Sequence, residues 1–184
     1  MLPDIGADCY RRYLEGDESG FEDLLDLYKD HLIFFINRYV SNLSIAEELA
    51  EDAFLELLIH KSRYNFKTSF KTYLFTIGRN KAVDFARRGS RYKFIDIDEV
   101  VEKSESYIQV EEKLLADERR KAINEALGSL KEDYRAALHL VYYEELSYEE
   151  AAKVMKKSRK QIENLVYRAR KALRKVLEKG NYDL

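Results

Sequence analysis

The sequence predicts an all-α protein in which an acidic linker joins two small helical domains, the second containing a helix-turn-helix. Seven Gly and one Pro in 184 residues leave few helix breakers. Hydrophobic residues make up 46% of the chain, enough for a core, and they recur at helical spacing. No alternating run of β-branched residues bounded by turns supports a sheet. The expected boundaries are residues 10–92 for the first domain, 93–110 for the linker and 111–180 for the second domain.

Three helices are expected in the first domain. The first spans residues 19–40. The second begins at Ser44, because Glu47 three residues later completes a capping box. The third spans residues 69–88 and ends at Gly89–Ser90. Their apolar stripes comprise Phe21, Leu24, Leu25, Tyr28, Leu32, Phe35, Ile36 and Tyr39 in the first helix, Ala46, Leu49, Ala50, Ala53 and Leu57 in the second, and Phe70, Tyr73, Leu74 and Ile77 in the third.

The charged residues are distributed in blocks that the net charge of −2 conceals. Residues 61–93 contain ten Lys or Arg and one acidic residue, and residues 153–175 again contain ten against one. The charged residues of 44–60 and 94–112 are mainly acidic. Two basic blocks of this kind indicate surfaces that bind a polyanion. The alternative for either block alone is an ordinary solvated helix face.

The most specific pattern lies in residues 147–175. Ser147 and Ser158 each begin a helix, and Glu150 and Gln161 follow three residues later to complete two capping boxes. The caps are eleven residues apart, which is the spacing of a helix-turn-helix. The helical segments of this domain are expected to break near Gly128, at 144–146 and at 156–157.

The second helix of this unit has two distinct faces. Lys and Arg on its outer face neutralise phosphates, and Asn and Arg also bind base edges in the major groove of duplex DNA. The alternative is a surface helix of an ordinary bundle. The inner face comprises Ile162, Leu165, Val166, Ala169, Leu173 and Val176, and the outer face comprises Lys160, Asn164, Tyr167, Lys171 and Arg174, flanked by Arg168.

Two further surfaces of the first domain are candidate contacts. Residues 65–74 interleave aromatic side chains with lysines, a composition that fits single-stranded nucleic acid. Phe70 and Tyr73 fall on an apolar stripe, which favours the core for both, so Phe66 and Lys67 in the connecting loop are the better candidates. Separately, an exposed leucine is expected among acidic residues of the second helix, where it is a candidate contact for a partner protein.

Several classes of function are disfavoured by what the sequence lacks. Cys9 is the only cysteine, which excludes an internal disulfide and a cysteine-based zinc cluster. His31, His60 and His139 are not at metal-ligand spacing, and there is no Gly-rich phosphate loop. We therefore expect no metal, no cofactor and no catalytic residue. With no recognisable signal peptide or membrane span, a cytoplasmic protein is expected.

The order of these parts resembles that of a bacterial RNA polymerase sigma factor of the extracytoplasmic-function group. Residues 45–54 resemble the helix that docks on the polymerase, and residues 69–84 resemble the segment that melts and binds the −10 promoter element. Residues 146–173 resemble the helix-turn-helix that binds the −35 element. The resemblance implies a protein that binds core RNA polymerase and promoter DNA to start transcription, with an anti-sigma factor as a further partner.

The resemblance also implies a role for individual residues. The expected −35 contacts to duplex DNA are Arg159, Lys160, Glu163, Asn164, Tyr167, Arg168 and Lys171. The expected −10 contacts to a single strand, including a flipped base near the loop, are Phe66, Lys67, Thr68, Ser69, Tyr73, Asn80 and Lys81. The expected core polymerase contacts are Glu48, Glu51, Asp52 and Leu55, which is the exposed leucine of the second helix.

This chain departs from the usual family pattern at four positions, namely Glu51 for Gln, Tyr73 for Trp, Lys156 for Gly and Glu163 for Lys or Arg. Glu163 either weakens phosphate attraction or accepts a hydrogen bond from a cytosine amino group. Two other classes remain open at this point. One is a helix-turn-helix repressor or activator that binds duplex DNA without polymerase, and the other is a helical adaptor that does not contact DNA.

Overall fold

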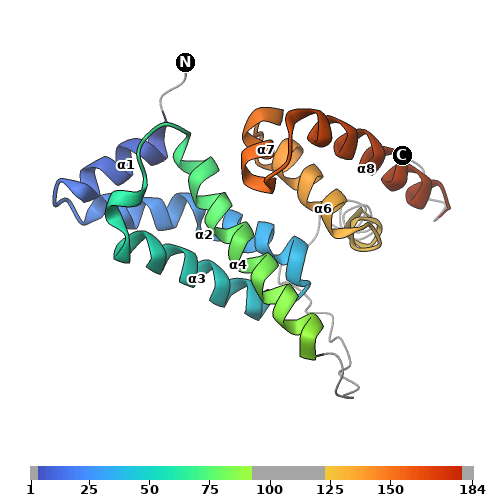
Figure 1. The fold of residues 1–184 in the computed structure, drawn as a ribbon, viewed down its shortest axis with the longest axis horizontal. Coiled ribbons are helices and arrows are strands. Elements are labelled where there is room, and N and C mark those ends of the chain that lie inside the picture. Colours follow the sequence, from blue (N-terminus) through green and yellow to red (C-terminus); the bar gives the residue numbers. More distant parts are fainter. Residues whose placement is uncertain (1–3, 93–122, 180–184) are drawn as a thin grey trace, which may run out of the picture.

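The computed structural model describes residues 4–92 and 123–179, and every regular element in these two ranges is helical (Figure 1). This confirms the predicted all-α class. The predicted linker, residues 93–110, lies outside the described residues. The elements are α1 (Ile5–Leu14), α2 (Ser19–Val40), α3 (Leu43–Ile59), the 3-10 turn η1 (Lys61–Arg63), α4 (Phe70–Tyr92), a helical segment at 123–128, α6 (Glu132–Leu138), the π-helical turn η2 (His139–Tyr143), α7 (Tyr148–Met155) and α8 (Arg159–Lys179).

Helix α1 was not among the predicted elements. Its first turn is capped by Asp4, whose carboxylate accepts a hydrogen bond from the Ala7 amide at 3.0 Å. Tyr10 is fully buried, and its hydroxyl donates to the backbone carbonyls of Leu57 and Lys61 at 3.2 and 3.1 Å. Because these partners lie about fifty residues along the chain, α1 is held by tertiary contacts that ten residues of sequence do not reveal.

Two predicted helix ends are wrong. Helix α3 begins at Leu43, because Asn42, not Ser44, caps it by accepting a hydrogen bond from the Ile45 amide at 3.1 Å. Ser41, in a left-handed conformation, ends α2 immediately before this cap. Helix α4 continues through residues 89–90 to Tyr92. A glycine costs only about 1 kcal/mol within a helix, too little to end one by itself.

Helix α2 lies at the centre of the first domain, in contact with α1, α3 and α4 (Figure 1). The predicted stripe of α3 contributes Ala46, Ala50 and Ala53, whose small buried side chains allow close packing on α2. Gly78 has a similar role in α4, since a Cβ atom there would lie 2.7 Å from Cδ1 of the buried Leu32. The backbone of α4 therefore approaches α2 more closely than any other residue type permits.

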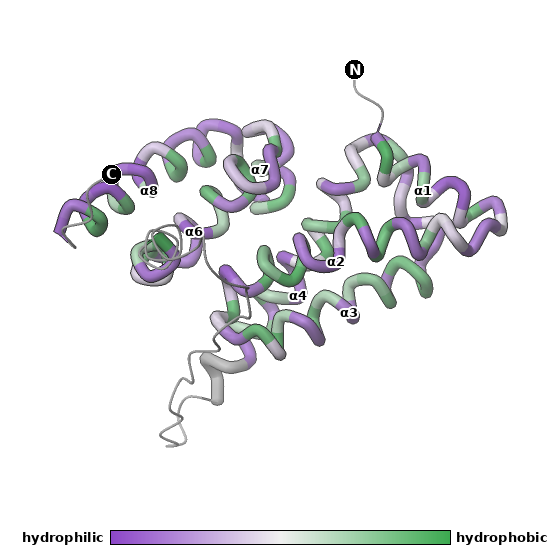
Figure 2. Tube along the Cα trace, turned by 180° about the vertical axis from the view of Figure 1, so that it is seen from behind, coloured by the Kyte–Doolittle hydropathy of each residue, from purple (hydrophilic) through white to green (hydrophobic). Residues whose placement is uncertain are grey.

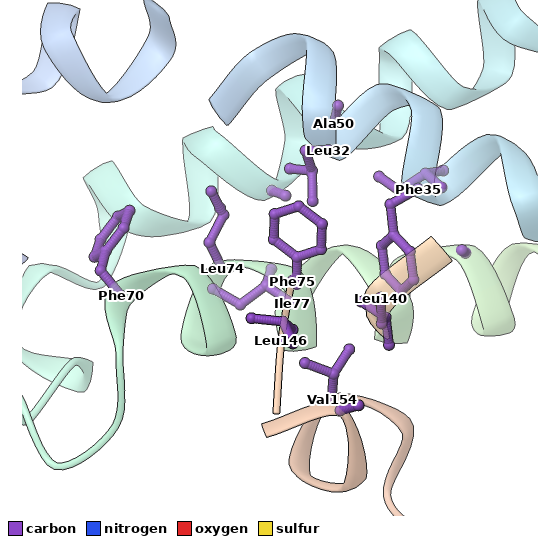
Figure 3. Close-up of a cluster of buried hydrophobic side chains, with 14 of the residues drawn as sticks. Leu32, Phe35, Ala50, Phe70, Leu74, Phe75, Ile77, Leu140, Leu146 and Val154 are labelled. Carbon is purple, nitrogen blue, oxygen red and sulfur yellow. The ribbon is translucent and has the colours of Figure 1, made fainter. Parts of the chain in front are cut away.

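The second domain packs directly on the first. Helix α7 lies against α4, and α6 lies against α2. Leu140, Leu146 and Val154 belong to the same buried cluster as Phe75 and Ile77 (Figure 3). Burial of this apolar surface, at roughly 25 cal/mol per Å², stabilises the contact between the domains. A smaller cluster joins Leu130 and Leu138 to Ala169 and so fixes α8 on α6.

No helix in the two described ranges is both long enough and apolar enough to cross a membrane.

Candidate nucleic-acid interface

The helix-turn-helix predicted for the second domain is formed by α7 and α8. The Ser147 hydroxyl accepts from the Glu150 amide at 3.3 Å, while the Glu150 carboxylate accepts from the Ser147 amide at 3.0 Å. At the start of α8, the Gln161 amide donates to the Ser158 hydroxyl at 3.2 Å, and the Ser158 amide donates to the Gln161 side chain at 2.7 Å. Both predicted capping boxes are therefore confirmed, and they set where each helix begins.

The turn between these helices depends on one residue in an unfavourable conformation. Lys156 has φ 53° and ψ 46°, in the left-handed region. The Lys157 amide then donates to the Ala152 carbonyl at 3.0 Å, which satisfies the end of α7. A side chain in this region costs roughly 1–2 kcal/mol relative to glycine. The turn therefore keeps its shape at the expense of local strain.

Helix α8 presents one buried and one exposed face, as predicted. Ile162, Val166 and Ala169 are buried, and Figure 2 shows hydrophilic and hydrophobic positions alternating along the helix. The exposed face contains Lys160, Asn164, Tyr167, Arg168, Lys171 and Arg174, of which Tyr167 is 69% exposed. Lys157, Gln161, Asn164, Leu165 and Arg168 line a shallow hollow beside it. Cationic, amide and aromatic groups are thus available together on one surface.

Arg159 and Glu163 interact with each other at the start of α8. The Arg159 guanidinium lies 2.9 Å from the Glu149 carboxylate and 3.1 Å from that of Glu163. The Glu163 carboxylate also lies 3.4 Å from the Lys160 ammonium. Pairs as exposed as these are weak, worth about 0–1 kcal/mol. They orient Arg159 without preventing it from binding another anion.

The loop before α4 and the first turn of that helix bring three aromatic rings together. Tyr64 is buried, and its ring centroid lies 4.6 Å from that of Phe66 and 4.9 Å from that of Tyr73. Phe66 has φ 58°, a rare conformation for an aromatic residue, and is 39% exposed. The Arg11 guanidinium of α1 lies over the Phe66 ring at 5.2 Å. The loop therefore presents an exposed aromatic ring beside a cation. Arg11 was not among the contacts predicted from the sequence.

The other predicted single-strand contacts do not all lie together. Lys67 is exposed, and Thr68 and Ser69 are half-buried at the start of α4. Asn80 and Lys81 are half-buried about 15 Å farther along the axis of α4, given a rise of 1.5 Å per residue. The Lys81 ammonium lies 3.3 Å from the Glu56 carboxylate. The loop and Asn80 therefore lie apart, the loop before the start of α4 and Asn80 almost three turns along it.

The acidic face of α3 is exposed. Glu48, Glu51, Asp52 and Leu55 recur at intervals of three and four residues, so they share one side of the helix. Leu55 is 51% exposed, which confirms the expectation that it is not part of the core. This face carries carboxylates and an accessible aliphatic side chain, a combination suited to a protein partner rather than to nucleic acid.

A polar cluster between the two domains covers the first turn of α4. The Glu144 side chain, with no exposed surface, accepts from Lys71 at 2.6 Å and from His31 and His139 at 3.1 Å each. Burial alone would raise the pKa of Glu144, but hydrogen bonds from His139 and Lys71 outweigh it and hold the pKa to about 2. We call Glu144, its three partners and the nearby Glu150 the interdomain polar cluster. In the sequence Lys71 belongs to a basic block, and nothing in its spacing indicates this contact.

Within the described ranges, no group of three or more His, Cys, Asp or Glu side chains is arranged to hold a metal ion. Cys9 is buried, beside the guanidinium of Arg12 at 3.8 Å.

Comparison with known proteins identifies similarity over both domains. The family described as Sigma-70 region 2 matches residues 24–92, and Sigma-70, region 4 matches residues 120–173. The RNA polymerase sigma factor YlaC of Bacillus subtilis is 28% identical over 163 residues, covering 88% of this chain and 94% of its own. The ECF RNA polymerase sigma factor SigW of the same species is 26% identical over 171 residues, covering 89% and 91%.

Solved structures have the same fold. The sigma factor RpoE of Bartonella quintana, in complex with the anti-sigma factor NepR, superimposes with a TM-score of 0.68 at 26% identity, covering 86% of this chain and 96% of its own. CnrH, in complex with the cytosolic domain of CnrY, superimposes with a TM-score of 0.66 at 20% identity, covering 95% and 96%. The latter supports the fold alone.

Proposed function

Because this chain is a sigma factor of the extracytoplasmic-function group, a subunit that directs core RNA polymerase to promoters, we propose that its two domains divide promoter recognition. Residues 10–92 bind the −10 element and core polymerase, and residues 111–180 bind the −35 element. The observation that carries this division is the pair of different surfaces on the two domains. One is an exposed cationic helix face, and the other is a loop with an exposed aromatic ring.

The exposed face of α8 binds the major groove of the −35 element. Its contacts are Arg159, Lys160, Glu163, Asn164, Tyr167, Arg168 and Lys171. Lys160 and Lys171 neutralise phosphates, while Asn164 and Arg168, which line the same hollow, bind base edges. Glu163 acts by orienting Arg159, to which it is paired at 3.1 Å.

The loop before α4 binds the melted strand of the −10 element. Phe66 offers an exposed ring on which a base stacks, and Lys67 is exposed beside it to meet the backbone. Thr68, Ser69 and Tyr73 complete this site. Asn80 and Lys81, farther along α4, contact a later part of the same strand, which is consistent with their separation from the loop. Extruding a base costs a few kcal/mol of unstacking, which these contacts offset.

The exposed face of α3 binds core polymerase. Leu55 supplies an apolar contact that Glu48, Glu51 and Asp52 surround with negative charge, so the matching polymerase surface is basic around an apolar hollow. The polymerase carries out the chemistry of transcription, and this chain supplies no catalytic residue. It acts where the polymerase acts, in the cytoplasm. By analogy with the sigma factor RpoE, which was solved with the anti-sigma factor NepR, an anti-sigma factor is a further partner.

Footprinting of an open promoter complex tests the division of roles. The triple substitution of Lys160, Arg168 and Lys171 by Ala should abolish protection around −35 but leave melting on a strong −10 element, measured by permanganate reactivity of unpaired thymines. Phe66→Ala with Lys67→Ala should reduce the permanganate signal and leave −35 protection. The proposal fails if each set of substitutions affects both elements equally.

A further inference from the structure

The first turn of α4 carries a set of hydrogen-bond donors that all point at carboxylates of the other domain. The Lys71 ammonium lies 2.6 Å from a Glu144 side-chain oxygen and also donates to the Glu144 backbone carbonyl at 2.9 Å. His31, from α2, lies 3.1 Å from both oxygens of the same carboxylate. Both of these side chains of the first domain therefore bind one residue of the second.

Glu150 provides the second carboxylate. One of its oxygens accepts from the Ser69 hydroxyl at 3.0 Å and lies 3.5 Å from the Thr72 hydroxyl. Its other oxygen accepts from the Ser147 amide and completes the capping box of α7. The same side chain therefore fixes the start of the helix-turn-helix and contacts the start of α4.

These donors form the kind of set that binds phosphate. An ammonium, an imidazole and two hydroxyl groups, all from the first domain, surround two anionic groups. Charge-assisted hydrogen bonds of this kind bind carboxylate and phosphate oxygens alike. Contacts from Lys, Ser and Thr to phosphate are also the usual way in which proteins hold a nucleic-acid backbone.

The position of the donors relates them to the proposed −10 site. Ser69, Lys71 and Thr72 directly follow the loop that presents Phe66 and Lys67. Glu144 is wholly buried against Lys71, and Glu150 contacts Ser69 and Thr72. Leu146, close to Glu144 in the chain, packs in the apolar cluster that the two domains share (Figure 3). A strand that leaves the loop along α4 cannot reach these donors until the second domain moves away.

We propose that Ser69, Lys71 and Thr72, together with His31, form a binding site for the phosphate backbone of single-stranded DNA, and that Glu144 and Glu150 occupy this site as internal phosphate mimics when the domains are closed. The inference rests on the proposed function, because it concerns the same −10 strand. Closure and strand binding are then mutually exclusive. The apparent affinity for the strand is reduced by the fraction of molecules that are closed.

Substitutions of the carboxylates and of Lys71 should have opposite effects on strand binding, and this tests the inference. The probe is a labelled single-stranded 12-mer of random sequence, since a backbone site is independent of sequence, and binding is followed by fluorescence anisotropy with the full chain. Glu144→Gln and Glu150→Gln should each increase the affinity, by about fivefold if most molecules are closed. Lys71→Ala also breaks the ion pair but should lower the affinity, because it removes a phosphate ligand. The double variant E144Q/K71A should not show the higher strand affinity expected of E144Q alone.

Control variants separate uncovering of the phosphate site from the effects of a changed net charge and of misfolding. Glu145→Gln makes the same charge change at the neighbouring exposed residue and should alter the affinity by less than about twofold. Glu150→Gln keeps a capping box, since Gln serves at that position, and so remains a test if the Glu144 variant does not fold. Small-angle X-ray scattering should give a larger radius of gyration for both Gln variants.

Three results would overturn the inference. The first is an unchanged affinity in both Gln variants, and the second is a Lys71→Ala variant that binds as tightly as Glu144→Gln. The third is a rise in affinity without any change in the radius of gyration. Promoter-directed transcription with core polymerase distinguishes a failure of this inference from a failure of the proposed function. If transcripts form but one of these results is obtained, only the masked phosphate site is wrong, whereas a wild-type chain that supports no transcription contradicts the proposed function and this inference together.

Discussion

The guanidinium of Arg159 lies 3.1 Å from the carboxylate of Glu163, one turn farther along α8. At that position the extracytoplasmic-function group frequently has a basic residue, so this chain has a carboxylate where phosphate attraction is common. Because Glu163 also lies 3.4 Å from the Lys160 ammonium, its negative charge offsets part of the positive charge that these two residues add to the exposed face. Glu163 therefore lowers the attraction of α8 for the phosphates of DNA of any sequence.

Substitution of Glu163 by Gln should therefore strengthen binding to duplex DNA of any sequence. Without the negative charge beside Arg159 and Lys160, the slope of log affinity against log salt should become steeper by about 0.9 for each additional phosphate that the helix neutralises. Asp84→Asn is the matched control, because it removes the same charge from an exposed pair, with Arg87 at 3.9 Å, on α4 rather than on α8. Equal slopes for wild type and E163Q would contradict this role of Glu163.

Lys156→Gly should stabilise the chain. It removes a side chain from a left-handed turn residue at φ 53°, so the free energy of unfolding should rise by about 1 kcal/mol. Lys153→Gly, in the exposed middle of α7, should have the opposite sign and cost about 1 kcal/mol. Urea denaturation of the two variants provides the comparison. A loss of stability in K156G would show that the turn is not strained.

Acid should destabilise the contact between the domains in two steps. Burial lowers the pKa of His139 and outweighs the hydrogen bond that His139 donates to Glu144, which raises it. Its contribution to stability is therefore present above about pH 6.5 and is lost as pH falls below that value. The groups that face this site are Lys71 from α4 and His31 and Arg38 from α2, with Arg38 donating to His139 at 3.3 Å.

The second step comes from Glu144, whose pKa is lowered to about 2. Its contribution, on the order of 3 kcal/mol, is present above about pH 4.5 and is lost as pH falls toward 2. Denaturation measured from pH 7.5 to 3 tests both steps. His139→Gln should flatten the curve between pH 7 and 5 while leaving the fall below pH 4.5. A stability that increases on acidification would contradict the direction of both shifts.

Leu55→Ser should weaken binding to core polymerase by about tenfold and leave stability unchanged, because the side chain is 51% exposed. Leu27→Ser, at a 40% exposed leucine on α2, is the matched control and should bind normally. Affinity for purified core enzyme is measured by biolayer interferometry, and DNA selectivity should not change. If both variants lose the same affinity for core polymerase, the exposed face of α3 is not the docking surface.

Local chemistry was predictable where it determines the structure. Helix α2 was predicted to its observed ends, Ser19 and Val40, because its apolar stripe continues from Phe21 to Tyr39. The two Ser caps of the helix-turn-helix were likewise predictable, since each hydrogen-bond partner lies three residues away. The exposure of Leu55 followed from its acidic neighbours and helical phase.

What the sequence did not reveal depends on distant partners. Tyr10 anchors α1 through the carbonyl of Leu57, 47 residues away. The contact between Lys71 and Glu144 spans 73 residues, and that between His31 and Glu144 spans 113. Residues this far apart show no periodicity or spacing that brings them together. The interdomain polar cluster, which covers part of the proposed −10 site, therefore required the structure.

Promoter-directed transcription measures the central claim most directly. Core RNA polymerase is incubated with a library of genomic promoter fragments, with and without this chain, and the transcript start sites are mapped. We predict discrete start sites that depend on the chain, that share sequence elements near −10 and −35, and that disappear with the triple Ala variant of Lys160, Arg168 and Lys171. Transcripts that are the same with and without the chain would contradict the claim that it is the subunit that selects promoters.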